Sequence, residues 1–197
     1  MQHVDRITAR KWRSLPWRNP REDLVRLGVF TAQMQRSGVF PTHDDLREKG
    51  LKRFLEAKQA ALFAHFIGEV IVKLPIAYAM HEAEDYDCVL WWKAEKKSFY
   101  APVQLKELVP TDLNPGATLD GELEKLGKYG RSSNTVVAVH MNQAGPVVYS
   151  EIRKPELKLG GLWLYSSITP DQSRWFLYGD VLRQPRGYEI DWPITIG

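Results

Sequence analysis

Residues 86–108 read YDCVLWWKAEKKSFYAPVQLKEL, and this stretch decides the fold of the 197-residue chain. Its first part, Tyr86–Trp92, and its last part, Phe99–Leu108, are rich in aromatic and β-branched residues, which favour strands. The polar residues 94–98 between them are typical of a turn. The stretch therefore predicts a β-hairpin of two antiparallel strands.

The register of this hairpin brings three polar side chains to one face. Side chains alternate between the faces of a strand, so Gln104 and Lys106 point the same way. If Trp92 pairs with Phe99, the numbers of paired residues sum to 191, which places Asp87 opposite Gln104. The Cβ atoms of such a pair lie about 5 Å apart. We therefore expect a carboxylate, an amide and an ammonium group to converge.

These side chains suit a magnesium site. Mg²⁺ prefers hard oxygen ligands, of which Asp87 offers a charged one and Gln104 a neutral one. Lys106 is suited to position or deprotonate a water and to stabilise a phosphoryl transition state. A glutamate from the preceding helix would complete the site. Glu69 is preferred because it interrupts an apolar stretch and needs a partner there, and Glu56 is the other choice.

The order of elements around these residues resembles the PD-(D/E)XK nuclease superfamily. A helix over residues 51–73 precedes the hairpin with Asp87 and Gln104-Leu105-Lys106, and a second helix and a buried strand, residues 135–141, follow it. Gln in place of the usual acidic residue resembles Mrr-like members, whereas Tyr86 stands where Pro is typical.

This resemblance implies an α/β or α+β fold with a central mixed sheet flanked by helices, and a restriction-endonuclease-like core. It also implies cleavage of phosphodiester bonds in DNA with Mg²⁺ or Mn²⁺. The implied metal ligands are Asp87, Gln104 and Glu69, and Lys106 is the implied catalytic lysine.

The N-terminal region is more basic than the chain as a whole. Residues 1–36 hold eight Lys and Arg side chains against three acidic ones, whereas the net charge is only +3. Arginines among tryptophans suit phosphate binding and base stacking, although a solvated basic surface is the alternative. The predicted nucleic-acid contacts are Arg10, Lys11, Arg13 and Arg18, to which the resemblance adds Lys125 and Lys128.

Other interpretations of the same residues stay open. Asp87, Gln104 and Lys106 also fit the solvated face of an antiparallel sheet. The neutral Gln104 favours a catalytically inactive nuclease-fold module that binds nucleic acid or a protein partner. A third hypothesis is a protein-interaction module in which Trp163 and Trp175 form an interface, for example in a homodimer.

The rest of the chain gives coarser expectations. We expect a basic arm with short helices over residues 1–50 and the nuclease-like core over residues 51–197, or one compact domain. The single cysteine, Cys88, excludes a disulfide framework, and an N-terminus without an apolar signal region favours a cytoplasmic protein with no membrane partner. Residues 146–152 predict a strand, residues 169–179 a helix and residues 183–197 an irregular tail.

Overall fold

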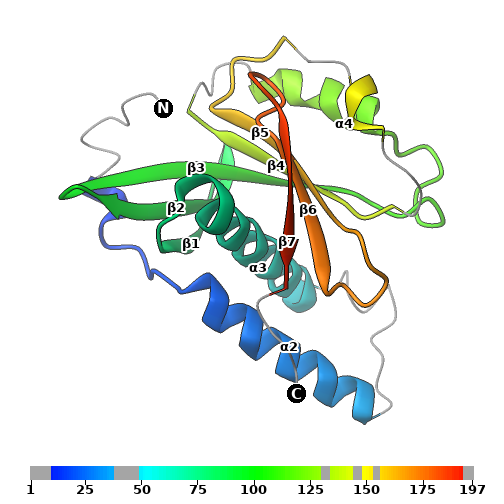
Figure 1. Cartoon of the computed structure of the whole chain (residues 1–197), viewed down its shortest axis with the longest axis horizontal. Helices are drawn as coiled ribbons and strands as arrows, with labels where there is room; N and C mark the ends of the chain where they lie inside the picture. The colour runs from blue at the N-terminus through cyan, green and yellow to red at the C-terminus, as the bar shows by residue number, and fades with distance from the viewer. Residues whose placement is uncertain (1–9, 38–48, 130–133, 144–147, 153–155, 193–197) are drawn as a thin grey trace.

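The computed structural model describes residues 10–37, 49–129, 134–143, 148–152 and 156–192, and its centre is a seven-stranded sheet (Figure 1). The helices are α2 (Pro20–Arg36), α3 (Lys49–Phe66) and α4 (Leu119–Lys125). The strands are β1 (Ile76–Ala83), β2 (Tyr86–Ala94), β3 (Lys97–Leu108), β4 (Val136–Met141), β5 (Gly161–Ser167), β6 (Arg174–Gly179) and β7 (Arg186–Asp191). The predicted α/β class, a mixed sheet with flanking helices, is confirmed.

The strands follow one another across the sheet in chain order, from β1 to β7. β1, β2 and β3 form an antiparallel meander, β4 and β5 continue parallel to β3, and β6 and β7 are antiparallel again. A parallel neighbour requires a crossover connection, and α4 lies in the connection from β3 to β4. The sheet is therefore parallel only in its centre.

The hairpin of β2 and β3 has the predicted register. Trp92 pairs with Phe99 and Cys88 with Val103, so the paired numbers sum to 191 along the ladder. The turn is shorter than expected, because pairing continues to Ala94 and Lys97. The two residues between them, Glu95 and Lys96, have φ values of 47° and 67°, which suits a tight hairpin turn that matches the strand twist.

Two helices cover the sheet from opposite faces (Figure 1). α3 packs its apolar residues, among them Phe63 and Phe66, against alternate residues of the strands, such as Leu90 and Val103. The residues of β4 that point the other way, Val137 and Val139, pack with α4. After Phe66 the helix widens into a π-helical segment, Ile67–Val72, and Lys73 ends it in the left-handed conformation.

Three local predictions are wrong in the C-terminal third. The segment expected to be a helix over residues 169–179 contains strand β6, in which Trp175, Leu177 and Gly179 are buried at every second position. Burial at every second position is typical of a strand, whereas the residues at 169–172 resemble a helix cap but do not begin a helix. Tyr149–Glu151 form a 3₁₀ turn inside the expected strand. β7 lies within the expected irregular tail.

Among the described residues, none of the helices combines the length and apolar character needed to cross a bilayer.

Candidate functional site

The two strands of the hairpin separate next to Asp87. The β2–β3 ladder ends at Cys88 and Val103. Beyond this pair, the Asp87 side chain, instead of a backbone carbonyl, accepts a hydrogen bond from the backbone of β3. Its Oδ2 accepts the backbone N–H of Leu105 at 2.7 Å. The side-chain amide of Gln104 donates to the same oxygen. The structure thus brings Asp87 and Gln104 together, as the register predicts.

Gln104 faces Asp87 with its amide nitrogen rather than its amide oxygen. The side chain is buried, and the same NH₂ group also contacts the carbonyl oxygen of Leu105 at 3.3 Å. A cation attracts an amide oxygen and repels an N–H group. The predicted role of Gln104 as a metal ligand therefore requires the amide to turn over, and in this conformation Gln104 instead holds Asp87 in place.

Asp87, Gln104 and Lys106 line one cavity of about 550 Å³. The first part of α3 lines it as well and contributes Glu56 together with Lys52. These two side chains form an ion pair, with Nζ of Lys52 3.6 Å from Oε1 of Glu56. Residues from α3, β2 and β3 therefore meet around a space that admits a small ligand or part of a polymer.

Glu69, the preferred helix glutamate, does not line this cavity, whereas Glu56 does. Glu69 belongs to the π-helical segment, its side chain is 62% exposed, and its Oε1 lies 3.9 Å from Nδ1 of His65. It lines a different cavity, together with Arg21. Glu69 comes thirteen residues after Glu56, or roughly 20 Å further along a helix axis, which places it towards the opposite end of the sheet.

The environment of Asp87 makes its ionised form costly. Burial raises the pKa of Asp87 above its usual value, and the nearby Glu82 raises it further. The Leu105 N–H, Lys106 and Lys52 lower it again without cancelling the effect of burial. A carboxylate in this position gains from any additional positive charge, which a bound cation supplies.

The side chains around the cavity fit a hard divalent cation in type. Asp87 and Glu56 offer carboxylate oxygens, and Mg²⁺ commonly uses one or two carboxylates together with waters and substrate phosphates. Among the described residues, no three His, Cys, Asp or Glu side chains gather closely enough to form a metal site by themselves. Cation binding here would therefore depend on water and substrate oxygens as well.

A further carboxylate at the cavity, that of Glu107, was not among the predicted site residues. Its Oε2 accepts an N–H of Gln59 at 3.2 Å, and its Oε1 accepts one from Asn142 at 2.7 Å. Nδ1 of His140 lies 3.9 Å from Oε1. The available signal was its position next to Lys106, but strand alternation assigns it to the opposite face. Hydrogen bonds from α3 and from the end of β4 give it a structural role.

The start of the described N-terminal arm, residues 10–13, packs against the sheet close to Asp87 through Trp12. This side chain is buried against the rings of Tyr86 and Tyr100, each with its centroid 5.8 Å away. Its indole N–H donates to the hydroxyl of Tyr86 at 3.2 Å. Because Tyr86 directly precedes Asp87, the arm starts close to the site. The basic residues around Trp12 are exposed, namely Arg10, Lys11 and Arg13.

The other predicted nucleic-acid contacts differ in their surroundings. Nε of Arg18 lies 2.8 Å from Oδ2 of Asp23, so Arg18 has a structural ion pair. Nζ of Lys125 lies 2.6 Å from Oε1 of Glu122 on α4. Lys128 lies in the 3₁₀ turn after α4, and its side chain is outside the described part of the chain. The exposed cations of the arm are therefore the better placed group.

Comparisons of the chain with protein-family models, with curated proteins and with solved structures gave no match. The chemical features of the Asp87 site are a half-buried carboxylate with a raised pKa, a lysine and a glutamate at the same cavity, and a basic arm that Trp12 anchors nearby.

Proposed function

We propose that this protein is a divalent-metal-dependent phosphodiesterase that cleaves DNA, with its active site at Asp87. The observation that supports this best is the meeting of Asp87, Gln104 and Lys106 at one cavity with Glu56 from the preceding helix. The order α3–β1–β2–β3–α4–β4, with β4 parallel to β3, agrees with the order of elements on which the resemblance to PD-(D/E)XK nucleases rests.

Each side chain has a role that follows from its surroundings. Asp87 and Glu56 would hold the cation, which in such sites lowers the pKa of a bound water and neutralises charge on the phosphate. Lys106 acts on Asp87 electrostatically and lines the same cavity, where it would orient the attacking water or stabilise the phosphate oxygens. Gln104 keeps the Asp87 carboxylate at the point where the strands separate.

The basic arm supplies the contacts to the polymer. Lys and Arg side chains that neutralise phosphates bind DNA without regard to its sequence and make the affinity fall with salt. Arg10, Lys11 and Arg13 are exposed next to the buried Trp12, which fixes the arm to the sheet. We therefore assign substrate binding to the arm and chemistry to the cavity.

The test is a cleavage assay on plasmid, linear duplex and single-stranded DNA with Mg²⁺ or Mn²⁺. Asp87→Asn, Lys106→Ala and Glu56→Gln each remove a group that acts on the reacting phosphate or on the cation. We expect each to slow cleavage by roughly a hundredfold or more. Circular dichroism and thermal unfolding establish that the variants are folded.

Glu69→Gln is the matched control, because it neutralises an exposed glutamate outside the cavity. We expect this variant to cleave at the wild-type rate. Cleavage by Asp87→Asn at the wild-type rate would reject the proposal, and so would a wild-type protein that cleaves none of the three substrates with either metal ion.

A second candidate is a nuclease-fold module that binds nucleic acid without cleaving it. The hydrogen bond from Gln104 to Asp87 favours this candidate, because it gives the carboxylate an internal partner in place of a metal ion. Salt-dependent DNA binding that persists in EDTA and in Asp87→Asn, in a protein without cleavage activity, would select this candidate.

A further inference from the structure

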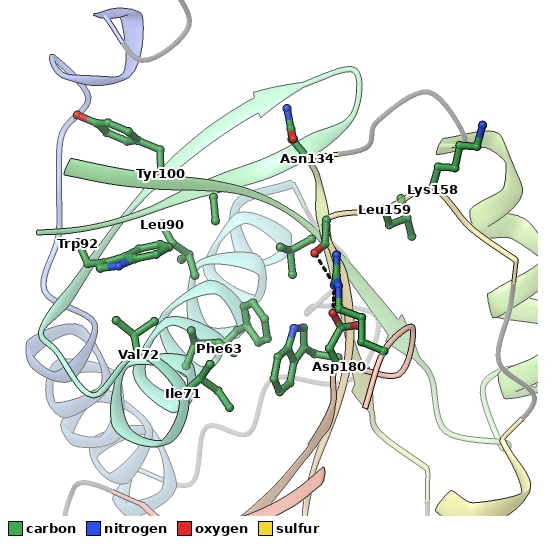
Figure 2. A pocket seen from close by; sticks show the side chains of 16 residues that line it. Phe63, Ile71, Val72, Leu90, Trp92, Tyr100, Asn134, Lys158, Leu159 and Asp180 are labelled. Carbon is green, nitrogen blue, oxygen red and sulfur yellow. Dashed lines mark hydrogen bonds and ion pairs between the residues drawn. The ribbon is translucent and has the colours of Figure 1, made fainter. Parts of the chain in front are cut away.

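A second cavity, of about 440 Å³, lies towards the other end of α3. Figure 2 shows Phe63, Ile71, Val72 and Trp92 on its apolar side and Asp180 and Asn134 on the opposite side. The apolar side is formed by the end of α3, the π-helical segment and β2, and the polar side by the segments that begin β4 and β5 and follow β6. Within the described part of the chain, the residues that line this space are all different from those of the Asp87 cavity.

The polar side holds an arginine whose position is fixed from within the fold. Oδ1 of Asp180 accepts the backbone N–H groups of Leu162 at 2.9 Å and Leu182 at 3.1 Å. Its Oδ2 pairs with Nη1 of Arg183, and Nη1 also donates to the carbonyl oxygen of Gly160 at 3.0 Å. Asp180 therefore serves to orient Arg183.

With Nη1 engaged in this way, the Nε and Nη2 donors of Arg183 are available to a ligand. Among the described residues, none bonds to Nε or Nη2 of Arg183, whose side chain is 57% exposed. A guanidinium group with two such donors matches a phosphate or carboxylate group. The exposed Lys158 also lines the cavity, with its side chain extending away from Asp180 in Figure 2. The polar side thus carries two cations and one carboxylate, and its net charge favours an anion.

Aromatic rings form flat surfaces on the two sides. Trp163 lies against Gly179, where a Cβ atom would come within 2.6 Å of the indole ring. A residue without a side chain is therefore needed for Trp163 to lie there. Trp92, on the apolar side, is held by a stacked contact with Phe99 at 5.6 Å and 13°. Rings held in this way suit a planar heterocycle, which gains affinity by stacking.

We propose that this cavity binds a nucleotide, with the base against the aromatic side chains and the phosphate at Arg183. The volume lies within the range of small-molecule sites. An aliphatic carboxylate would use Arg183 equally well but would not use the flat rings. The inference rests on the proposed action on DNA and deepens it, because the nucleotide is either free or part of a strand with its base turned out.

Calorimetric titration of the full chain with dAMP, dGMP, dCMP and dTMP tests the proposal, with decanoate as the aliphatic comparison. Ile71→Trp fills the cavity from its rim, where Ile71 is 36% exposed, and we expect it to abolish binding. Leu74→Trp is the matched control, since Leu74 is 38% exposed but lies outside the cavity. We expect it to bind like the wild type.

A second pair of variants tests the phosphate contact. We expect Arg183→Gln to weaken nucleotide affinity by about tenfold to a hundredfold, the value of a charge-assisted hydrogen bond. Arg174→Gln is its control, because Arg174 pairs with Glu189 and Asp191 away from the cavity. Oligonucleotides that contain 2-aminopurine distinguish the source of the nucleotide, since the fluorescence of this base rises when it leaves the stack.

The outcomes separate this inference from the proposed function. Binding of a mononucleotide or a 2-aminopurine signal, either of them lost in Ile71→Trp, supports the cavity even if the protein cleaves nothing. The proposal is overturned if neither signal occurs or if decanoate alone binds. It is also overturned if nucleotide affinity is unchanged in both Ile71→Trp and Arg183→Gln, or if Asp87→Asn abolishes nucleotide binding and Ile71→Trp does not.

Discussion

Replacing Gln104 by an acidic residue tests the contact on which the site depends. Gln104 donates an N–H to Oδ2 of Asp87, whereas the introduced side chain of Gln104→Glu would place a second carboxylate against the first. We expect this variant to be less stable without metal and to gain more stability from Mg²⁺ than the wild type. Both effects follow from charge, because Glu and Gln have nearly the same shape.

The size of the loss can be worked out from the contact. Two charges about 4 Å apart repel by about 4 kcal/mol at an effective dielectric constant of 20. The two carboxyl groups avoid this repulsion if one of them stays protonated, because the proton then forms a hydrogen bond between the introduced glutamate and Asp87. Keeping a carboxyl group of ordinary pKa about 4.3 protonated costs about 1.4 kcal/mol per pH unit. The expected loss is therefore about 4 kcal/mol at pH 7 and about 1 kcal/mol at pH 5.

Urea unfolding of wild type and Gln104→Glu at pH 5 and pH 7, without metal, measures this difference. Mg²⁺ at a hundredfold excess over its dissociation constant would return about 2.7 kcal/mol to the variant at pH 7. Gln104→Leu is the control, since it removes the hydrogen bond without adding charge. A loss of equal size at both pH values, with no response to Mg²⁺, would show that Gln104 and Asp87 do not make the contact described.

Two further predictions concern the core. Burial lowers the pKa of His140 to about 4, so the unfolded chain binds more protons than the folded protein between pH 6.5 and 4. The free energy of unfolding therefore falls by about 3 kcal/mol as the pH drops through this range. The variant His140→Phe keeps a ring stacked on Tyr165, and its free energy of unfolding would lack this pH dependence. Gly160→Ala would place a Cβ atom 2.5 Å from the backbone oxygen of Asn134 and lower the free energy of unfolding by about 1–3 kcal/mol. Gly127→Ala is its control, because a Cβ atom at position 127 meets nothing in the described structure within 4 Å, its own chain neighbours aside, and we expect this variant to unfold like the wild type.

The hairpin was predictable because two local signals agree there. β-Formers on both strands and a polar turn define the pairing, and the period of two fixes the faces once one pair is chosen. Register shifts of one residue would expose Val103 and Leu105, which are buried. The proximity of Asp87 and Gln104 follows from this register alone, so it needed no tertiary information.

The amide orientation and the helix glutamate were not predictable in this way. Which end of the Gln104 amide meets Asp87 depends on the position of the Leu105 carbonyl, which also contacts the amide nitrogen. The choice between Glu56 and Glu69 depends on where α3 crosses the sheet. An apolar neighbourhood in sequence favoured Glu69, but the π-helical segment places that side chain at the surface.

α3 connects the two cavities, and its sequence explains why they differ. Lys52 and Glu56 line the Asp87 cavity, and Phe63 lines the second cavity, which Trp92 and Trp163 also line. Phe63 comes eleven positions after Lys52, which corresponds to roughly 16 Å of helix, or about five base steps of DNA at 3.4 Å each. One bound strand is therefore long enough to reach both spaces. Because the polar and apolar halves of α3 are separated along its axis rather than around it, one helix supports an ionic site at one end and an aromatic site at the other.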